Sequence, residues 1–132
     1  MHDVTKLRIW DKALELAEKI YSLTAGFPRE ESYGLSSQMK RAVVSIGSNI
    51  AEGAGRNSNR EFYQFIGISC GSASELRFQI ELSYRCSFIT TDQRDELISD
   101  IDYIMRMNFR LQSRIRSEEN DRNKRNSPRQ GS

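Results

Sequence analysis

The chain has almost no histidine or cysteine, and this shortage excludes most metal chemistry. His2 is the only histidine of 132 residues, so the Glu-x-x-His pairs of a di-iron helix bundle cannot form. Cys70 and Cys86 are the only cysteines and lie outside any C-x-x-C pair. They are too few for a thiolate zinc site, and we expect both to be reduced, buried thiols. We therefore predict a protein without a metal or any other cofactor.

Proline and long apolar runs are also scarce. Pro28 and Pro128 are the only prolines, and long proline-free stretches favour long helices. No apolar run approaches the roughly 20 residues of a membrane span. The first residues, MHDVTKLRIWDKA, lack the apolar core of a signal peptide. We expect a cytoplasmic protein with no membrane segment.

The overall composition is typical of a small helical protein in a single domain. Hydrophobic residues make up 37% of the chain and charged residues 29%, which suits amphipathic rather than wholly apolar helices. The net charge is only +2, less than a dedicated nucleic-acid-binding domain usually carries. The distribution of the charges is therefore more informative than their sum.

Apolar residues recur at helical spacing in four segments, which predicts four helices. These segments cover about residues 5–23, 33–52, 58–86 and 90–115. Gly53 and Gly55 are expected to end the second helix, because glycine accepts the left-handed conformation that follows many helices. Ser58 with Glu61, and Thr90 with Gln93, have the spacing of capping boxes that begin the third and fourth helices.

No strand pattern competes with these helices, and the connections between them are short. We predict an all-α protein whose residues 1–116 form an antiparallel up-down-up-down four-helix bundle. Residues 117–132 contain no large apolar side chain. Such a composition cannot form a packed core, so this segment is predicted to be a disordered basic and polar tail.

Two patterns resemble enzyme motifs, and neither has the required context. Residues 67–71 match G-x-S-x-G, but a nucleophile elbow needs a strand-to-helix turn and a later histidine. The glycines of SIGSNIAEGAGR, residues 45–56, lack the spacing and the lysine of a P-loop. We predict no catalytic residues and a protein that is not an enzyme.

In helical phase, the same stretch carries a polar strip on one face of the second helix: Ser45, Ser48, Asn49 and Glu52. Where these side chains are buried they must be hydrogen-bonded, and their small size permits close packing against the third helix. Register places Arg41 level with Glu75, so we predict an Arg41–Glu75 ion pair. The alternative, that both are solvated surface charges, stays open.

Charges are predicted to separate toward the two ends of the bundle. The up-down-up-down topology gathers basic residues at one end: Lys6, Arg8, Arg56, Arg60, Arg110, Arg114 and Arg116. The opposite end collects Glu30, Glu31, Asp92, Asp95 and Glu96. Part of this asymmetry complements the helix dipoles. A cluster of arginines also suits phosphate backbones, and without identifiable stacking aromatics such binding should tolerate any sequence.

Several motifs together resemble a bacterial four-helix-bundle family. They are L-x-I-W-x-K-A-x-E-L-A, F-P-x-E followed by Y-G-L, Q-M-K-R-A-x-x-S-I-x-S-N-I-A-E-G, and G-S-x-x-E-L. The family includes the proteins encoded in intervening sequences of 23S ribosomal RNA genes, and the accessory variability determinant of diversity-generating retroelements is similar. The resemblance covers about residues 5–112. Gly47 stands where the family often has proline, which would alter a local kink.

This resemblance implies a homopentameric ring without known catalysis. It also implies a role in binding nucleic acid or a partner protein, and extends the basic surface to Lys40, Arg41, Arg56 and Arg60. Four tyrosines are candidates for semi-exposed contact residues: Tyr33, Tyr63, Tyr84 and Tyr103. The alternative, a monomer with ordinary surface aromatics, stays open. Two functions remain open. One is sequence-tolerant binding of RNA or DNA through the basic end; the alternative is a scaffold for a partner protein, such as a polymerase, without direct nucleic-acid binding.

Overall fold

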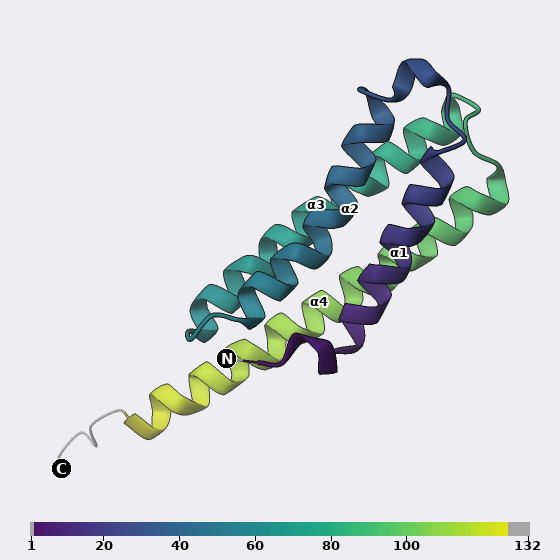
Figure 1. Ribbon diagram of the computed structural model, residues 1–132. Coiled ribbons are helices and arrows are strands. Elements are labelled where there is room, and N and C mark those ends of the chain that lie inside the picture. Colours follow the sequence, from purple (N-terminus) through teal and green to yellow (C-terminus); the bar gives the residue numbers. More distant parts are fainter. Residues whose placement is uncertain (1, 127–132) are drawn as a thin grey trace, which may run out of the picture.

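The computed structural model describes residues 2–126 and contains four antiparallel helices (Figure 1). Their bounds are α1 Arg8–Thr24, α2 Leu35–Ala54, α3 Asn59–Arg85 and α4 Thr91–Asn126, with single turns of 3-10 helix at Val4–Lys6 and Arg29–Glu31. Each helix packs against the next in the chain, and α1 also packs against α4. The predicted all-α, up-down-up-down four-helix bundle is confirmed.

Capping side chains begin α3 and α4 where the sequence predicted them. The Glu61 backbone N–H donates to Ser58 Oγ over 3.3 Å. The Gln93 N–H donates to Thr90 Oγ1 over 3.1 Å, and Gln93 Oε1 accepts from the Thr90 N–H over 2.9 Å. This reciprocal pair satisfies backbone donors that have no partner within the helix.

The end of α2 differs from the prediction. Gly53 lies inside the helix, and Gly55 follows it with φ −80° and ψ −7°, a right-handed conformation. The Gly55 N–H donates to the Ala51 carbonyl over 3.2 Å, so the last turn simply closes without a left-handed residue. Of the described residues, only Ser87, in the turn between α3 and α4, has a positive φ among the non-glycine residues, at 63°.

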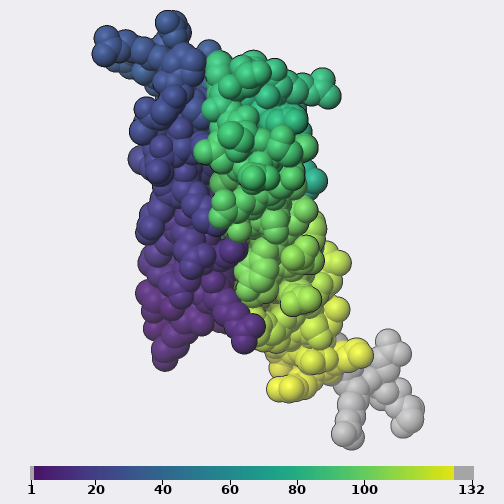
Figure 2. All heavy atoms as spheres, turned by 90° about the vertical axis from the view of Figure 1, so that its right-hand side faces the viewer, coloured from purple at the N-terminus to yellow at the C-terminus, as the bar shows by residue number. Residues whose placement is uncertain are grey.

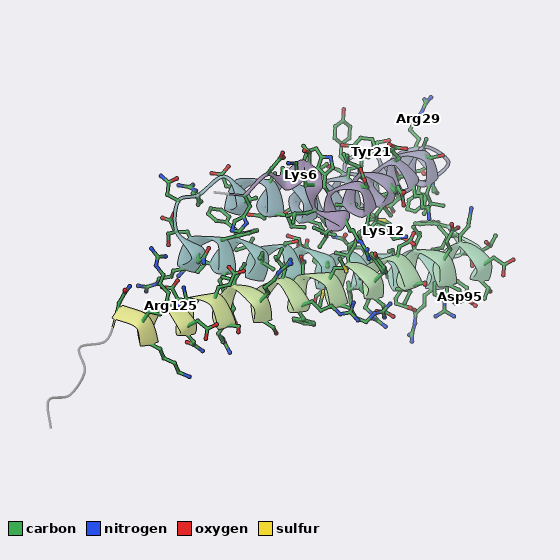
Figure 3. The ribbon with its side chains drawn as sticks, turned by 90° about the horizontal axis from the view of Figure 1, so that it is seen from below. Lys6, Lys12, Tyr21, Arg29, Asp95 and Arg125 are labelled. Carbon is green, nitrogen blue, oxygen red and sulfur yellow. The ribbon has the colours of Figure 1, made fainter. Side chains whose placement is uncertain are left out.

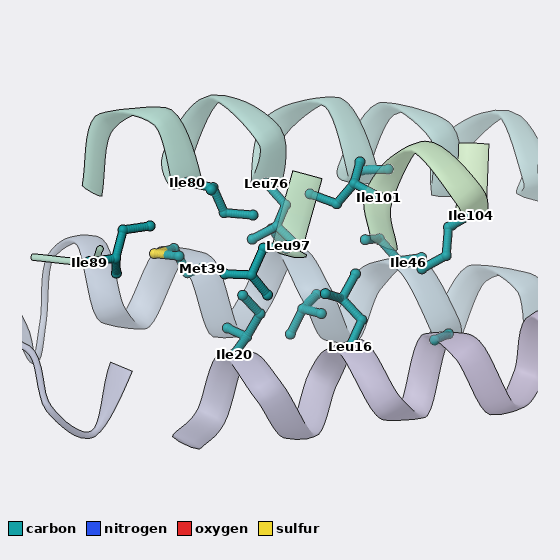
Figure 4. Packing of buried hydrophobic residues seen from close by; sticks show 14 of the residues in the cluster. Leu16, Ile20, Met39, Ile46, Leu76, Ile80, Ile89, Leu97, Ile101 and Ile104 are labelled. Carbon is teal, nitrogen blue, oxygen red and sulfur yellow. The ribbon is translucent and has the colours of Figure 1, made fainter. Parts of the chain in front are cut away.

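Interlocking isoleucine and leucine side chains from all four helices form the core (Figure 4). A second cluster lies toward the end where α2 meets α3, and consists of Ala54, Phe62, Ile66, Leu111 and Ile115. Removing its phenylalanine, isoleucine and leucine side chains from water contributes about 1.5–3 kcal/mol each. The second cluster therefore holds together the part of the bundle that carries the predicted basic surface.

Polar side chains cross the interface between α2, α3 and α4. Buried Ser69 Oγ donates to the Ile46 carbonyl over 2.9 Å and accepts from Asn108 Nδ2 over 3.1 Å. Within the predicted polar strip, Ser45 Oγ lies 2.7 Å from Ser72 Oγ, and Asn49 Nδ2 donates to Ser45 Oγ over 3.0 Å. These bonds supply the partners that half-buried polar atoms need.

The other members of the strip face solvent. Ser48 is exposed, and Glu52 forms an ion pair with Arg56. Among the ion pairs of residues 2–126, none joins Arg41 to Glu75, so that prediction is wrong. Glu75 instead accepts a hydrogen bond from Gln79 one turn later in α3, over 3.2 Å.

A buried carboxylate ties α1 to α4. Asp100 accepts from Lys19 over 2.7 Å and lies 3.0 Å from Lys12. The hydrogen bonds from Lys19 to Asp100 and to Glu96 raise the pKa of that ammonium above its ordinary value. A raised lysine pKa contributes stability below the unfolded pKa, and this contribution is lost as the pH rises through the folded value. The contacts of Lys19 with Asp100 and Glu96 therefore persist at neutral pH.

The predicted disordered tail is wrong for residues 117–126, which continue α4 as helix (Figure 1). None of these residues is buried, so local charge pairing rather than a core accounts for the extension. Acidic residues precede basic ones, Glu119 lies 3.9 Å from Arg122, and Lys124 and Arg125 occupy the last turn. Both arrangements favour helix. Residues 127–132 of the predicted tail lie outside the described residues.

Candidate nucleic-acid interface

Opposite charges lie toward opposite ends of the long axis. Arg125 marks one end and Asp95 the other (Figure 3). Near Asp95, several acidic side chains are already paired, because Arg94 contacts both Glu81 and Asp95, and Lys19 contacts Glu96. Toward the end of the bundle marked by Arg125, most arginines of the described residues have no carboxylate partner. The separation of charge therefore leaves more free cations than free anions.

A first basic groove runs between α4 and the segment that leads into α1. It has a volume of about 470 Å³ and is lined by Lys6, Leu7, Arg8, Ile9, Met107, Arg110, Leu111 and Arg114. Figure 2 shows this face, with the N-terminal segment in purple beside the green and yellow of α4. Among the described ion pairs, none involves the four cations of this groove. Their charges face an apolar floor and are available to an anion.

A second groove lies between the first turns of α3 and the later part of α4. Its volume is about 420 Å³, and it is lined by Asn59, Arg60, Tyr63, Gln64, Ile115, Arg116, Glu119 and Asn120. The Arg116 guanidinium carbon sits 5.1 Å from the centroid of the Tyr63 ring, and Arg116 Nη2 donates to the Tyr63 hydroxyl over 2.6 Å. A cation–π contact and a charge-assisted hydrogen bond thus hold the guanidinium against the tyrosine.

Arg56 is placed at this end but is not a free cation. Its Nη2 lies 2.7 Å from Glu52 Oε1, and its guanidinium carbon is 5.1 Å from the centre of the Phe65 ring. The Glu52 carboxylate pairs with the charge, while the side chain itself stays exposed. Arg60, which follows it in the first turn of α3, has no carboxylate partner among the described ion pairs.

Lys40 and Arg41 are not brought together with the other predicted binding residues. Both lie in the first half of α2, and the 13 residues from Arg41 to Ala54 correspond to about 20 Å of helix at the usual 1.5 Å rise. Lys40 Nζ sits 5.5 Å from the centre of the Tyr21 ring. Both side chains line a separate shallow groove of about 600 Å³.

The features that first resembled catalytic motifs are structural. Ser69, the centre of G-x-S-x-G, is fully buried and bonded to a backbone carbonyl. Both cysteines are free; Cys86 is exposed, contrary to the prediction, while Cys70 is half-buried. Burial raises the pKa of the Cys70 thiol, which disfavours the nucleophilic thiolate. Within residues 2–126 no group of histidine, cysteine and acidic side chains could hold a metal ion.

The helices of the described part are also too short or too polar to cross a membrane.

Cations gather at one end of the surface, along two grooves that flank α4. This arrangement can bind phosphate groups by charge-assisted hydrogen bonds.

Comparison with known proteins identifies the family. A family model for the 23S rRNA-intervening sequence protein matches residues 5–110. The chain belongs to this family. The match confirms the resemblance drawn from the helix motifs, and it ends before the last part of α4.

A solved structure of the same kind supports the fold. The chain is similar to a protein of unknown function from the S23 ribosomal protein family of Bacteroides thetaiotaomicron, with 28% identity and a TM-score of 0.74. The similarity covers 80% of this chain and 95% of that one. Comparison with curated proteins gives no match. The 23S rRNA-intervening sequence family is thus established for this chain.

The second groove was not among the predictions from the sequence. The sequence predicts Tyr63 only as a semi-exposed aromatic, and the side-chain amides around it belong to no recognised motif. The spacing of residues in α3 could have indicated this groove, because Arg60, Tyr63 and Gln64 stand three and four residues apart and share a helix face. The contact between Tyr63 and Arg116, however, depends on the register of α3 against α4, which the sequence alone does not give.

Proposed function

We propose that this member of the 23S rRNA-intervening sequence family is a non-catalytic, oligomeric protein that binds nucleic acid through its basic end. The observation that carries the proposal is the groove lined by Lys6, Arg8, Arg110 and Arg114, whose cations have no carboxylate partner in the described ion pairs. Unpaired cations along a groove fit a chain of phosphates. Nothing in this groove selects a base, so binding should tolerate any sequence.

The extended end of α4 supports the same function. Arg122, Lys124 and Arg125 lie on exposed helix that runs past the other three helices (Figure 1). This extension continues the line of α4 from Arg110 and Arg114. Basic residues spread along one helix would follow a nucleic-acid backbone over several phosphates.

Binding across a salt series tests the proposed function. We expect the protein to retard RNA or duplex DNA of random sequence at low salt, with a steep loss of affinity as salt rises, because each neutralised phosphate releases a counterion. A gel-shift or anisotropy titration between about 50 and 200 mM salt measures the slope. Absence of binding at the lowest salt would contradict the proposal.

We further propose that the protein assembles into a ring of identical subunits, a homopentamer as the family resemblance implies. An apolar hollow of about 260 Å³ between α1 and α2 is lined by Trp10, Ala13, Leu14, Ala17, Val43, Val44, Gly47, Ser48, Ile50 and Ala51. Leu14 and Val44 are each nearly half exposed. On α3 and α4, Ile68, Phe78 and Phe109 are more than half exposed. A ring needs two different, complementary patches on each subunit, and we assign the hollow and these exposed side chains to the two patches.

Replacing Val44 by glutamate is expected to dissociate the assembly. The charge would enter the apolar hollow between α1 and α2, where its desolvation in an interface is unfavourable. Light scattering coupled to size exclusion should give the mass of a ring for the natural protein and of a monomer for the variant. Ser48→Glu, at the polar rim of the same hollow, should have a smaller effect. A monomeric natural protein would contradict the assembly.

The alternative function is a scaffold that binds a partner protein, such as a polymerase, without touching nucleic acid. The exposed aromatic side chains Phe78 on α3 and Phe109 on α4 favour it, since aromatic residues are enriched at protein interfaces. Capture of a partner from a nuclease-treated lysate, together with no nucleic-acid binding at low salt, would support this alternative over the first proposal.

A further inference from the structure

We infer that the groove beside Tyr63 and Arg116 is a subsite for one unpaired nucleobase of a single-stranded nucleic acid. The inference rests on the proposed nucleic-acid binding and goes beyond it, because cations alone would not distinguish a base from a bare phosphate chain. The groove lies on the other side of α4 from the one that holds Arg110 and Arg114. A strand could therefore place phosphates in one groove and a base in the other.

Arg116 is held in place by Tyr63. Its guanidinium carbon lies 5.1 Å from the centroid of the Tyr63 ring, and its bond of 2.6 Å to the Tyr63 hydroxyl fixes it there. Arg116 is exposed, so its planar guanidinium is open to a further flat group. Arginine planes and aromatic rings are the usual platforms for unstacked bases. A guanidinium already fixed by a hydrogen bond loses little freedom when a base stacks on it.

Side-chain amides line the same groove as Arg116. Asn59 and Gln64 line the groove from α3, and Asn120 lines it from α4. Each amide offers both a donor and an acceptor, which matches the mixed donors and acceptors along the edge of a base. A phosphate, which only accepts hydrogen bonds at neutral pH, would leave the amide oxygens without donors.

Charges of both signs line the groove, at different places. Arg60 stands in the first turn of α3, where the helix dipole also favours an anion. Glu119 lines the same groove from α4 and lies 3.9 Å from Arg122. Its carboxylate repels a phosphate at that side but accepts hydrogen bonds from the amino groups of bases. The neutral base thus belongs near Glu119 and the backbone near Arg60.

Three short oligonucleotides of equal length test the subsite: a single-stranded RNA, the same backbone without bases, and a duplex. Anisotropy titrations at fixed low salt compare the natural protein with Arg116→Lys, which keeps the charge but removes the flat platform. We expect the variant to lose about tenfold in affinity for the single strand, since stacking of one base is worth about 5- to 150-fold. Its affinity for the base-free chain should not change.

Two further variants sharpen the result. Tyr63→Phe keeps the ring but removes the hydroxyl that holds Arg116, so it should lose part of the same affinity. Arg85→Lys makes the same exchange in the last turn of α3, at the opposite end of the bundle and outside both grooves, and should leave all three affinities nearly unchanged. A 2-aminopurine base in the single strand should be quenched by the natural protein and much less by Arg116→Lys.

The outcomes separate this inference from the proposed function. Equal affinity of the natural protein for the single strand and the base-free chain would overturn the base subsite while leaving binding to phosphates intact. An equal loss on both ligands in Arg116→Lys would also overturn it. Absence of binding to any of the three would overturn the proposed function and the subsite together. Thermal melting of each variant by circular dichroism checks that the bundle is unchanged.

Discussion

Replacing both Arg110 and Arg114 by glutamate is expected to weaken nucleic-acid binding by on the order of 100-fold at low salt. The two arginines stand one helical turn apart on α4, are exposed, and line the same groove as Lys6 and Arg8. The substitutions remove two cations that would neutralise phosphates and add two repulsive charges. The log–log slope of affinity against salt should fall by about two, one for each phosphate that is no longer neutralised.

A charge-matched variant distinguishes a local site from a general effect of net charge. Lys40→Glu with Arg41→Glu changes the net charge from +2 to −2, as the Arg110 and Arg114 pair does. Because Lys40 and Arg41 lie about 20 Å from the basic end, this control should retain most of the affinity. Equal losses in both double variants would contradict the placement of the site. Surface substitutions of this kind usually change stability by less than about 0.5 kcal/mol, so both proteins should melt near the natural temperature.

The gathering of basic residues at one end could be predicted because it depends only on helix order. Once four helices alternate in direction, Lys6, Arg60 and Arg114 must lie at the same end, whatever the details of packing. The state of each side chain could not be predicted in this way. Arg56 forms an ion pair with Glu52, four residues earlier in the chain, while Arg116 donates a hydrogen bond to Tyr63 on a different helix.

The length of α4 shows a second limit of the sequence. The absence of large apolar residues after Ile115 correctly indicates that none of residues 117–126 is buried. It does not indicate disorder, because a helix that is already nucleated extends without a core when its charges are well spaced. The Arg41–Glu75 pair failed for a related reason: a level register does not ensure that two long side chains turn toward each other, and Glu75 turned to Gln79 in its own helix.

The glycines of the α2 signature illustrate a third limit, since the role of Gly53 is close packing rather than a turn. An added Cβ on Gly53 would lie 2.7 Å from Phe65 Cβ and 2.9 Å from Phe62 Cδ1. Phe62 is buried in the second core cluster, so it has little room to move. Gly53 therefore sets how closely α2 approaches α3 just before the turn between them, at the base of the proposed binding end.

Gly53→Ala is expected to lower the free energy of unfolding by about 1–3 kcal/mol, the usual cost of overpacking. Gly71→Ala is the matched control, because it makes the same change within a helix and a Cβ there meets nothing within 4 Å. With alanine's better helix propensity, that control should gain up to about 1 kcal/mol. Urea unfolding followed by circular dichroism measures both. A gain of stability in Gly53→Ala would mean that the two phenylalanines yield and that close packing does not require glycine. The opposite signs expected for one chemical change separate the close approach at Gly53 from any general effect of glycine on these helices.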